Sequence, residues 1–494
     1  MHQTPLWPVV LDHRVPQNYT SPMGPIPRSW LLLGGTGILL AILLVALSVI
    51  SPDLAVERIS ESAPILTSVL ILMAAGSLYL ALIFLLKKIH FAKEHLFLVI
   101  LLGLVMRLTM FGSTPILEDD HYRYLWDGAV LANGFNPYRY SPQEIRNGDP
   151  DHIPDRLRQM AAEAGHITEH INYPWLRTIY PPLTQVAFAL AHIITPWSLT
   201  GWRILLLLLD GLTFYLLYLL LTRLHLPLSF LMIYWWNPLL IKEIYNSGHM
   251  EMVLLPLLLA SLLFTIREKY LIASAALGLA VGAKFWPVLL IPVVWRPLLK
   301  DLKHLVPAFF IFTGLAVAMF LPIFLSGLDY HSGFAAYGKY WEMNDALFML
   351  ILWGVQMGLD VFQLNGANAQ EVTRIVVSVI LVLCILWAVR RPHEAPLEIG
   401  RRFLFVISAL FLLSPTQFPW YSLWMLPFLS ILPRLSLLLL TPLLSLYYIR
   451  YYFQAKGMVH IHDHGIVWLE FVPVWCLLMW EWIKQRPREK SNCI

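Results

Sequence analysis

Long apolar runs separated by short polar connections dominate this chain. The first three runs cover about 30–50, 64–86 and 95–111, close to the ~20 residues that an α-helix needs to cross a bilayer. Further runs follow at about 183–196, 203–222, 228–245, 250–266, 270–295, 305–326, 345–358, 371–389, 401–414, 419–433, 435–453 and 466–483. Several are short or interrupted by proline, which indicates half-helices. The pattern predicts an all-α polytopic membrane protein with about 12–14 spans.

Composition agrees with a membrane protein. The 494 residues are 58% hydrophobic and 13% charged, with a mean hydropathy of +0.64, whereas soluble domains are roughly 25% charged. One soluble core of this length is excluded, because cores stop growing beyond about 250–300 residues. The net charge is +4, and the lysines and arginines form no basic stripe of the kind that binds nucleic acid. The three cysteines lie in apolar runs and the tail, so they indicate neither a disulfide framework nor a thiolate metal site.

Basic residues predict the topology. Lys87, Lys88 and Lys93 form a short loop between the second and third runs, and short basic loops stay in the cytoplasm. The Pro-rich tail 1–28, which lacks the layout of a cleaved signal peptide, is then cytoplasmic. The large loop 112–180 is extracytoplasmic. The basic tail 485–494 places the C-terminus inside, so the transmembrane domain 29–484 has an even number of spans.

The large loop carries helical patterns of its own. Asp120, Tyr124, Asp127 and Leu131 recur at i, i+4, i+7 and i+11, which is one face of a short helix that Gly134 ends. An apolar stripe over 153–171 predicts a second helix, able to lie flat on the membrane surface.

Glu118, Asp119, Asp120 and Asp127 place four carboxylates within ten residues, directly after an apolar run. Adjacent carboxylates repel one another, so one can keep a raised pKa and act as a proton acceptor or donor. The plainer alternative is that Asp119 or Asp120 caps a helix and that Arg123 pairs with Asp127. The cluster alone does not separate these interpretations.

Other ionisable residues interrupt apolar runs, at a cost of about 2.5–3.5 kcal/mol each on insertion scales, which favours a functional interpretation. They are Arg107, Lys242, Glu243, His249, Glu251 and Lys284. The alternative is that Lys242 and Glu243 only pair with each other and that Lys284 extends to the interface.

Two further segments are weaker candidates. Trp420 and Tyr421, next to prolines at a helix entrance, can line a lipid or sugar site, although such residues also populate membrane interfaces. His460, His462 and His464 alternate as metal-binding histidines do, but a wet loop is the favoured interpretation.

The order of these motifs resembles the membrane-embedded, polyprenyl-phosphate-sugar-dependent glycosyltransferases of class C, in particular the bacterial α-mannosyltransferase-like branch. The resemblance covers about 100–485. Its motifs here are Glu118-Asp119-Asp120-His121-Tyr122-Arg123-Tyr124-Leu125-Trp126-Asp127-Gly128, Gly134-Phe135-Asn136-Pro137-Tyr138, Tyr180-Pro181-Pro182-Leu183, Gly248-His249-Met250-Glu251, Lys284-Phe285-Trp286-Pro287, Pro419-Trp420-Tyr421 and Val467-Trp468-Leu469-Glu470-Phe471. The first of them is the most specific.

The resemblance implies a fold, a reaction and site residues. It implies a sugar donor on a polyprenyl phosphate, a lipid-linked or polysaccharide acceptor, and an active site on the outer side of the cell membrane. Asp119 matches the general base and Asp120 an acceptor-orienting or cation-holding position, while Arg123, His249 and Lys284 are candidates to neutralise the leaving phosphate. The remaining substrate-binding candidates are Tyr124, Asp127, Tyr180, Glu251, Trp420 and Tyr421. The family includes metal-dependent and metal-independent members, so a divalent cation stays open, and no metal ligands are assigned.

Inverting transfer of a sugar, with mannose implied by the branch, is therefore the leading hypothesis. A transporter or flippase for lipid-linked sugars is the alternative, but it needs charges along a path through the bilayer and preferably a repeat, and the acidic cluster lies at one surface. A third hypothesis is a membrane protein of lipid metabolism that has the same fold but acts on another acceptor or on none.

Overall fold

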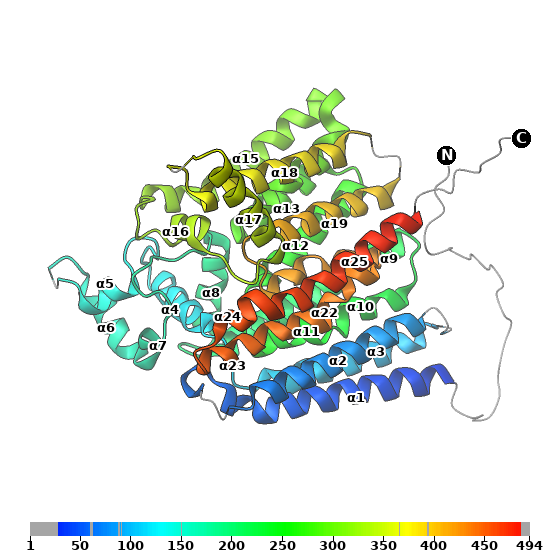
Figure 1. The fold of residues 1–494 in the computed structure, drawn as a ribbon, viewed down its shortest axis with the longest axis horizontal. Coiled ribbons are helices and arrows are strands. Elements are labelled where there is room, and N and C mark those ends of the chain that lie inside the picture. The colour runs from blue at the N-terminus through cyan, green and yellow to red at the C-terminus, as the bar shows by residue number, and fades with distance from the viewer. Residues whose placement is uncertain are drawn as a thin grey trace, which may run out of the picture.

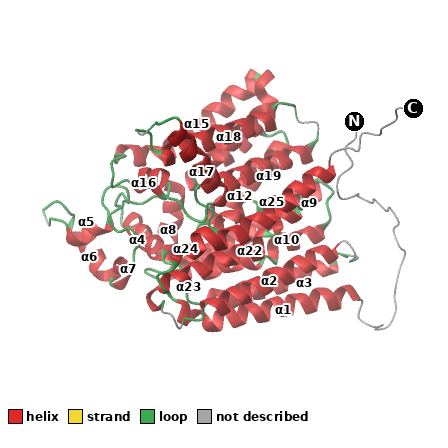
Figure 2. Cartoon of the chain, viewed as in Figure 1, coloured by secondary structure: helices red, strands yellow, loops and turns green. Residues whose placement is uncertain are grey.

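The structure is a computed structural model that describes residues 28–59, 63–86, 89, 91–149, 151–364, 366–392 and 395–485. Helices make up the regular structure of these residues, and the only strand-like pairing among them is one bridge between Met343 and Thr416 (Figure 2). The predicted all-α class is confirmed. Lys87, Lys88, the tail before Arg28 and the basic tail beyond 485 lie outside the described residues.

Within the described residues, seven helical segments are long and apolar enough to cross a membrane. They are Arg28–Leu54, which contains α1 (Arg28–Ile50), α2 (Ile65–Leu86), α3 (Glu94–Phe111), α9 (Leu199–Arg223), α15 (Leu302–Leu325), α18 (Ala369–Val389) and Val459–Lys484, which contains α24 (Val459–Ile461) and most of α25 (Val467–Gln485). Four shorter apolar helices are α8 (Pro182–Ile194), α12 (Glu251–Ile266), α13 (Tyr270–Ala283) and α17 (Ala346–Val361). The chain is a multi-pass membrane protein, as predicted.

Helices α12, α15 and α25 continue through their prolines as single helices, but other proline-containing runs form short consecutive helices instead of single spans. These and the remaining helices are α10 (Leu231–Trp235), α11 (Pro238–Ile241), α14 (Ile291–Trp295), α16 (Gly333–Tyr340), α19 (Pro396–Leu413), α20 (Leu426–Ile431), α21 (Leu435–Leu438), α22 (Leu440–Leu443) and α23 (Ile449–Ala455). At the break between α10 and α11, the Asn237 side chain accepts a hydrogen bond of 2.9 Å from the Leu240 N–H and so caps α11. Such breaks allow polar groups to lie inside the bundle.

The long helices run side by side, and the large loop lies at one end of them (Figure 1). That loop forms α4 (Asp120–Ala132), α5 (Pro142–Asn147), α6 (Asp155–Ala164) and α7 (His166–Glu169). The start of α1, the end of α2 and the end of α25 lie at the opposite end (Figure 1). The large loop thus lies at the end of the bundle opposite the helix ends that adjoin the two tails, as the basic residues predict (Figure 1). Which of these ends faces the cytoplasm stays a prediction.

The apolar stripe predicted for a membrane-surface helix is buried within the protein. It forms α6 and α7, divided at Gly165, whose φ is +53°. The side chains of Leu157, Met160 and Ile167 pack with Trp126 and other residues of α4 in a separate small core. The membrane-surface interpretation is therefore wrong, because the stripe finds its apolar partner on α4.

The helix that carries the acidic cluster is held against the bundle by a close backbone contact. A Cβ atom at Gly128 of α4 would lie 2.4 Å from the Phe188 carbonyl oxygen of α8, nearer than any side chain tolerates. Glycine at this position therefore fixes how deeply α4 sits on the bundle.

We expect Gly128→Ala to destabilise the protein by about 1–3 kcal/mol, because the added methyl group must push α4 away from α8. The midpoint of thermal unfolding in detergent measures this. Gly211→Ala is the matched control, because a Cβ atom at Gly211 in α9 meets no atom within 4 Å. Equal melting temperatures for the two variants would contradict the close contact.

Candidate functional site

The acidic cluster lies at the turn that leads into α4. Leu117 is buried with φ +56°, an uncommon conformation for a non-glycine residue, and its N–H donates to the Leu54 carbonyl at 2.9 Å. Asp119 follows at the N-cap position, but its side chain makes no capping hydrogen bond. The capping interpretation is therefore wrong for the Asp119 carboxylate, which is left available for other partners.

Asn172 joins the two central carboxylates. Its amide nitrogen donates to Asp119 Oδ1 at 2.8 Å and to Asp120 Oδ1 at 2.9 Å. One amide thus holds two like charges side by side and offsets part of their repulsion. Both aspartates remain half-buried, and the Asp120 side chain is 26% exposed.

Burial raises the pKa of Asp119 and of its neighbour Glu118. Desolvation, followed by the charge of Asp120, raises the pKa of Asp119 to about 6. Desolvation also raises the pKa of Glu118 well above its usual range. Asp119 thus combines partial exposure with a pKa near neutrality, as a proton acceptor requires.

Arg123 holds the segment that carries Asn172. Its guanidinium is buried and donates to the carbonyls of Asn172 at 3.1 Å, Tyr173 at 3.0 Å and Leu176 at 3.1 Å. The expected alternative partner, Asp127, instead accepts from Gln185 Nε2 at 3.0 Å. Arg123 therefore positions the segment that carries Asn172.

His249 lies directly behind the aspartate pair. Its side chain is fully buried and stacks on Trp420 with a centroid distance of 3.8 Å and an interplanar angle of 15°. Its Nδ1 lies 3.9 Å from Asp120 Oδ2, and its Nε2 lies 3.4 Å from Glu243 Oε2 and 3.9 Å from Glu118 Oε2. Three carboxylates thus surround one imidazole.

Lys242 and Glu243 pair with each other, as the structural alternative predicted, but they lie at the site. Lys242 Nζ is 3.4 Å from Glu243 Oε2, and both side chains are fully buried. Tyr448 accepts a hydrogen bond from Lys242 and donates to Glu243 Oε1 at 2.6 Å. Its hydroxyl also lies 3.4 Å from Glu118 Oε1. The pair is therefore part of the network around His249.

Lys284 forms a second buried ion pair nearby. Its Nζ lies 2.8 Å from Glu251 Oε1 and 3.8 Å from the centre of the Tyr421 ring. The Lys284 side chain is 20% exposed, whereas the Glu251 side chain is 1% exposed. Lys284 thus keeps a path to the surface that the fully buried His249 lacks.

Of the two tyrosines predicted for the site, Tyr124 lies on α4 and Tyr180 lies just before α8. The Tyr124 hydroxyl donates to Asp120 Oδ2 at 3.3 Å, and its ring stacks on Phe188 with a centroid distance of 4.6 Å. Tyr180 meets Tyr124 edge to face with a centroid distance of 5.2 Å. Tyr124 therefore touches the acidic pair, and Tyr180 supports it.

The segment that carries His460, His462 and His464 is only partly exposed to solvent. His460 and His464 are exposed, as predicted, but His462 is buried, with Nδ1 3.0 Å from Asp463 Oδ1 and Nε2 3.7 Å from Glu470 Oε1. The wet-loop interpretation is therefore wrong for His462.

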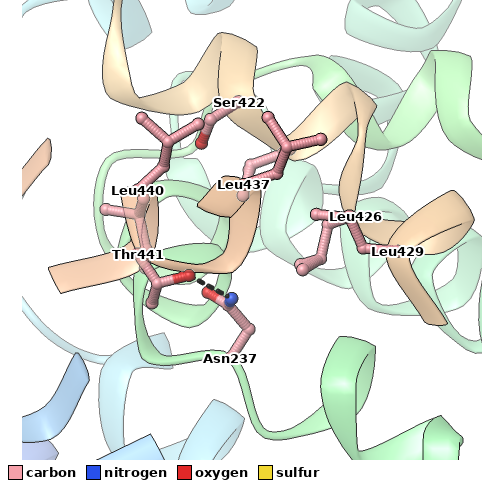
Figure 3. A pocket seen from close by; sticks show the side chains of 9 residues that line it. Asn237, Ser422, Leu426, Leu429, Leu437, Leu440 and Thr441 are labelled. Atoms are coloured by element: carbon pink, nitrogen blue, oxygen red, sulfur yellow. Dashed lines mark hydrogen bonds between the residues drawn. The ribbon is translucent and has the colours of Figure 1, made fainter. Parts of the chain in front are cut away.

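A pocket elsewhere in the bundle lies between the α10–α11 break and helices α20 to α22. Leucines line most of it, and Asn237 Nδ2 donates to Thr441 Oγ1 across it at 2.9 Å (Figure 3). No residue of the acidic cluster lines it.

Sequence reasoning missed Asn172 and Tyr448, and it assigned no site role to Glu243. Asn172 and Tyr448 lie 52 and 330 residues from Asp120 and Glu118, their partners in the site. An asparagine within the conspicuous polar loop is a signal that could have drawn attention to Asn172. No comparable local signal marks Tyr448 among the many tyrosines of the chain.

The helical bundle defines an integral-membrane protein, the class predicted from the apolar runs, and it carries a half-buried carboxylate pair at one end. Residues 29–298 match the family model described as "Alpha-(1->6)-mannopyranosyltransferase, N-terminal domain". Because the match covers more than half of the chain, the protein belongs to this mannosyltransferase family.

One curated relative supports this membership. The chain is similar to an Alpha-(1->6)-mannopyranosyltransferase A of Corynebacterium glutamicum, with 22% identity over 377 residues, which cover 65% of this chain and 69% of the relative. No solved structure matches. The predicted resemblance to membrane-embedded α-mannosyltransferases is confirmed, and the chain is a glycosyltransferase.

We expect Asn172→Ala to lower the rate of sugar transfer about 10- to 100-fold, because hydrogen bonds to charged groups contribute about 1.5–3 kcal/mol. The two carboxylates then lose the amide that sets their spacing. Initial rates measured in membranes, together with the melting temperature, test this. Asn133→Ala is the control, because the Asn133 side chain, just after α4, donates to the Ala129 carbonyl and accepts from Arg156 but contacts no carboxylate. A full rate for Asn172→Ala would show that the spacing of the pair is unimportant.

Proposed function

We propose that this protein transfers a mannosyl group from a polyprenyl phosphate to a hydroxyl of a lipid-linked or cell-envelope glycan, on the extracytoplasmic side of the membrane. One observation carries the proposal. Asp119 occupies a helix N-cap position, yet its carboxylate caps nothing and is held beside Asp120 by Asn172. A carboxylate kept available at the polar end of a membrane bundle suits a general base.

In the proposed reaction, Asp119 accepts the proton of the acceptor hydroxyl. The acceptor oxygen forms a bond to the anomeric carbon of mannose while the bond from that carbon to the phosphate oxygen breaks. The electron pair of the broken bond leaves with the polyprenyl phosphate. Attack in line inverts the anomeric carbon, so a β-linked mannosyl phosphate yields an α-mannoside. Asp120, half-buried beside the base, orients the acceptor.

Lys284 is the best of the three candidates to neutralise the leaving phosphate. Arg123 uses its guanidinium on backbone carbonyls, and His249 is fully buried. Lys284 is 20% exposed and is held by Glu251 and the Tyr421 ring. Negative charge on the phosphate grows as the bond breaks, so an ammonium placed beforehand stabilises the transition state more than the ground state.

The aromatic residues Trp420 and Tyr421 shape the site and do not stack on the sugar. Trp420 stacks against both His249 and Phe418. Tyr421 stacks against Trp424 and carries the Lys284 ammonium over its ring. Their ring faces are therefore covered, and their proposed role is to hold His249 and Lys284 in place.

The proposed orientation rests on charge placement and on the shape of the chain. Lys93 precedes α3 and Lys484 lies in the last turn of α25, and these two helix ends are opposite the acidic cluster (Figure 1). With lysines in the cytoplasm, the cluster faces outward, where a lipid-linked donor and a glycan acceptor meet. A flippase is not favoured, because the carboxylate pair lies at one end of the bundle.

We expect Asp119→Asn to reduce product formation about 10²- to 10⁴-fold, the usual contribution of a general base. Membranes that contain each variant are incubated with labelled polyprenyl phosphate mannose and native lipid acceptors, and the lipid and polymer fractions are read by mass spectrometry. Asp155→Asn is the control, because it makes the same change at an 81% exposed carboxylate of the same loop.

Hexose product from the wild type and Asp155→Asn, but not from Asp119→Asn, supports both the reaction and the base. Equal product from all three proteins removes Asp119 from the mechanism. If none forms product with a mannosyl donor, then mannose on polyprenyl phosphate is not the substrate.

We expect Lys284→Gln to lower kcat about 10²- to 10³-fold with a smaller change in KM for the donor, because its charge acts mainly in the transition state. Lys284→Arg keeps the positive charge and should restore part of the rate. Lys303→Gln is the control, because Lys303 is exposed. Steady-state kinetics with purified donor measure the split, and a change confined to KM would contradict the proposed role.

A further inference from the structure

The group of side chains around His249 has geometry that hydrogen bonding does not explain. Neither ring nitrogen of His249 has a hydrogen-bond partner, although the side chain is fully buried. Burying an unpaired polar group costs about 1–3 kcal/mol, so such a group needs an explanation. The imidazole points at carboxylates on every polar side, at 3.4 to 3.9 Å.

These separations are too long for hydrogen bonds; the one from His249 to Glu243 is that of two ligands on one ion, and the one from His249 to Glu118 is a few tenths of an ångström longer. An N–H···O hydrogen bond has a heavy-atom distance of about 2.7–3.2 Å. Two ligand atoms about 2.0–2.2 Å from a tetrahedral ion lie about 3.3–3.6 Å apart. His249 Nε2 lies 3.4 Å from Glu243 Oε2 and 3.9 Å from Glu118 Oε2, and one ligand atom from each of the three residues falls within 4.8 Å of the others.

We infer that Glu118, Glu243 and His249 bind one divalent transition-metal ion, with Zn²⁺ as the best fit, behind the aspartate pair. One imidazole nitrogen and two carboxylate oxygens are ligands that zinc accepts, whereas Mg²⁺ and Ca²⁺ prefer oxygen alone. All three side chains are at most 5% exposed. The ion is therefore enclosed and positions its ligands instead of touching the leaving phosphate.

The surrounding groups match those that orient metal ligands. The Tyr448 hydroxyl lies 2.6 Å from Glu243 Oε1 and 3.4 Å from Glu118 Oε1. It thus donates to the outer oxygen of Glu243 and lies against the outer oxygen of Glu118, and the Oε2 atoms of both residues face His249. The Nδ1 of His249 faces Asp120 Oδ2 at 3.9 Å, the side from which a carboxylate commonly supports a metal-bound imidazole.

The surroundings of His249 are acidic. Lys242 is the buried cation beside this group, with Nζ 3.4 Å from Glu243 Oε2. Three carboxyl groups face His249, from Glu118, Glu243 and Asp120, so acidic groups outnumber this single cation. Such surroundings suit a divalent cation. Because His249 also faces Asp120, a bound ion would help to position the residue proposed to orient the acceptor.

The test measures bound metal and not activity. Full-length protein in detergent is stripped with a chelator, equilibrated with Zn²⁺ alone, desalted and assayed for zinc by mass spectrometry. We expect about one zinc per chain in the wild type and less than about a tenth of that in His249→Gln and Glu118→Gln, because each lost ligand weakens the site. Equilibration with Mg²⁺ alone should leave none bound.

His95→Gln is the matched control, because His95 is a buried histidine that hydrogen-bonds Ser29 and lies in the first turn of α3, and α3 starts at the end of the bundle opposite α4 (Figure 1). It should retain zinc. Size-exclusion chromatography establishes that each variant is folded, and Glu118→Gln, which keeps the shape of the side chain, serves if His249→Gln does not fold. Absence of zinc from the wild type overturns the inference. Equal zinc in His249→Gln also overturns it, since the ion then binds elsewhere, for example at exposed His460 and His464.

The inference does not depend on the proposed reaction. Asp119→Asn should retain zinc even where it abolishes transfer, because the Asp119 carboxylate does not face His249. Loss of zinc without loss of transfer in His249→Gln would limit the ion to a structural role. Loss of both, with His95→Gln unaffected, supports a positioning role for the ion.

Discussion

The repulsion among carboxylates gathered at one end of the bundle is the constraint on which the site depends. Glu118, Asp119, Asp120 and Glu243 lie close together in a partly dry environment, where like charges repel more strongly than in water. Each therefore needs a donor or cation from a different part of the chain. Asn172 reaches in from the large loop, and Lys242 and Tyr448 come from broken helices inside the membrane domain. Compensating these charges draws distant segments together.

The apolar pattern predicted the long helices well because a span must be nearly continuous in hydrophobicity. The runs at 30–50, 64–86 and 95–111 became helices within two residues of those limits. The pattern failed where two apolar surfaces compete. The stripe over 153–171 has the periodicity of a membrane-surface helix, but periodicity does not say whether the apolar partner is lipid or protein. Proline-rich runs were predicted to be broken, although where each piece ends depends on packing.

Asp119 and Asp120 could be found from sequence because charges are scarce in this chain and these two are adjacent. Their shared donor could not be found, because Asn172 is joined to them only by the fold. The role of Arg123 was also hidden. A guanidinium beside acids suggests an ion pair, yet its donors serve three carbonyls that become neighbours only when the loop closes. Local sequence thus identifies reactive groups better than it identifies what holds them.

The separate small core of the large loop has a consequence for how such a protein can diverge. Its apolar residues, including Leu157, Met160 and Ile167, pack on the outer face of α4 around Trp126, and not in the main core of the membrane domain. Insertions or exchanges in α5 to α7 can therefore accumulate while Gly128 still fixes α4 on the bundle. Sequence changes in these helices can therefore alter the surroundings of the carboxylates without changing how the membrane domain packs.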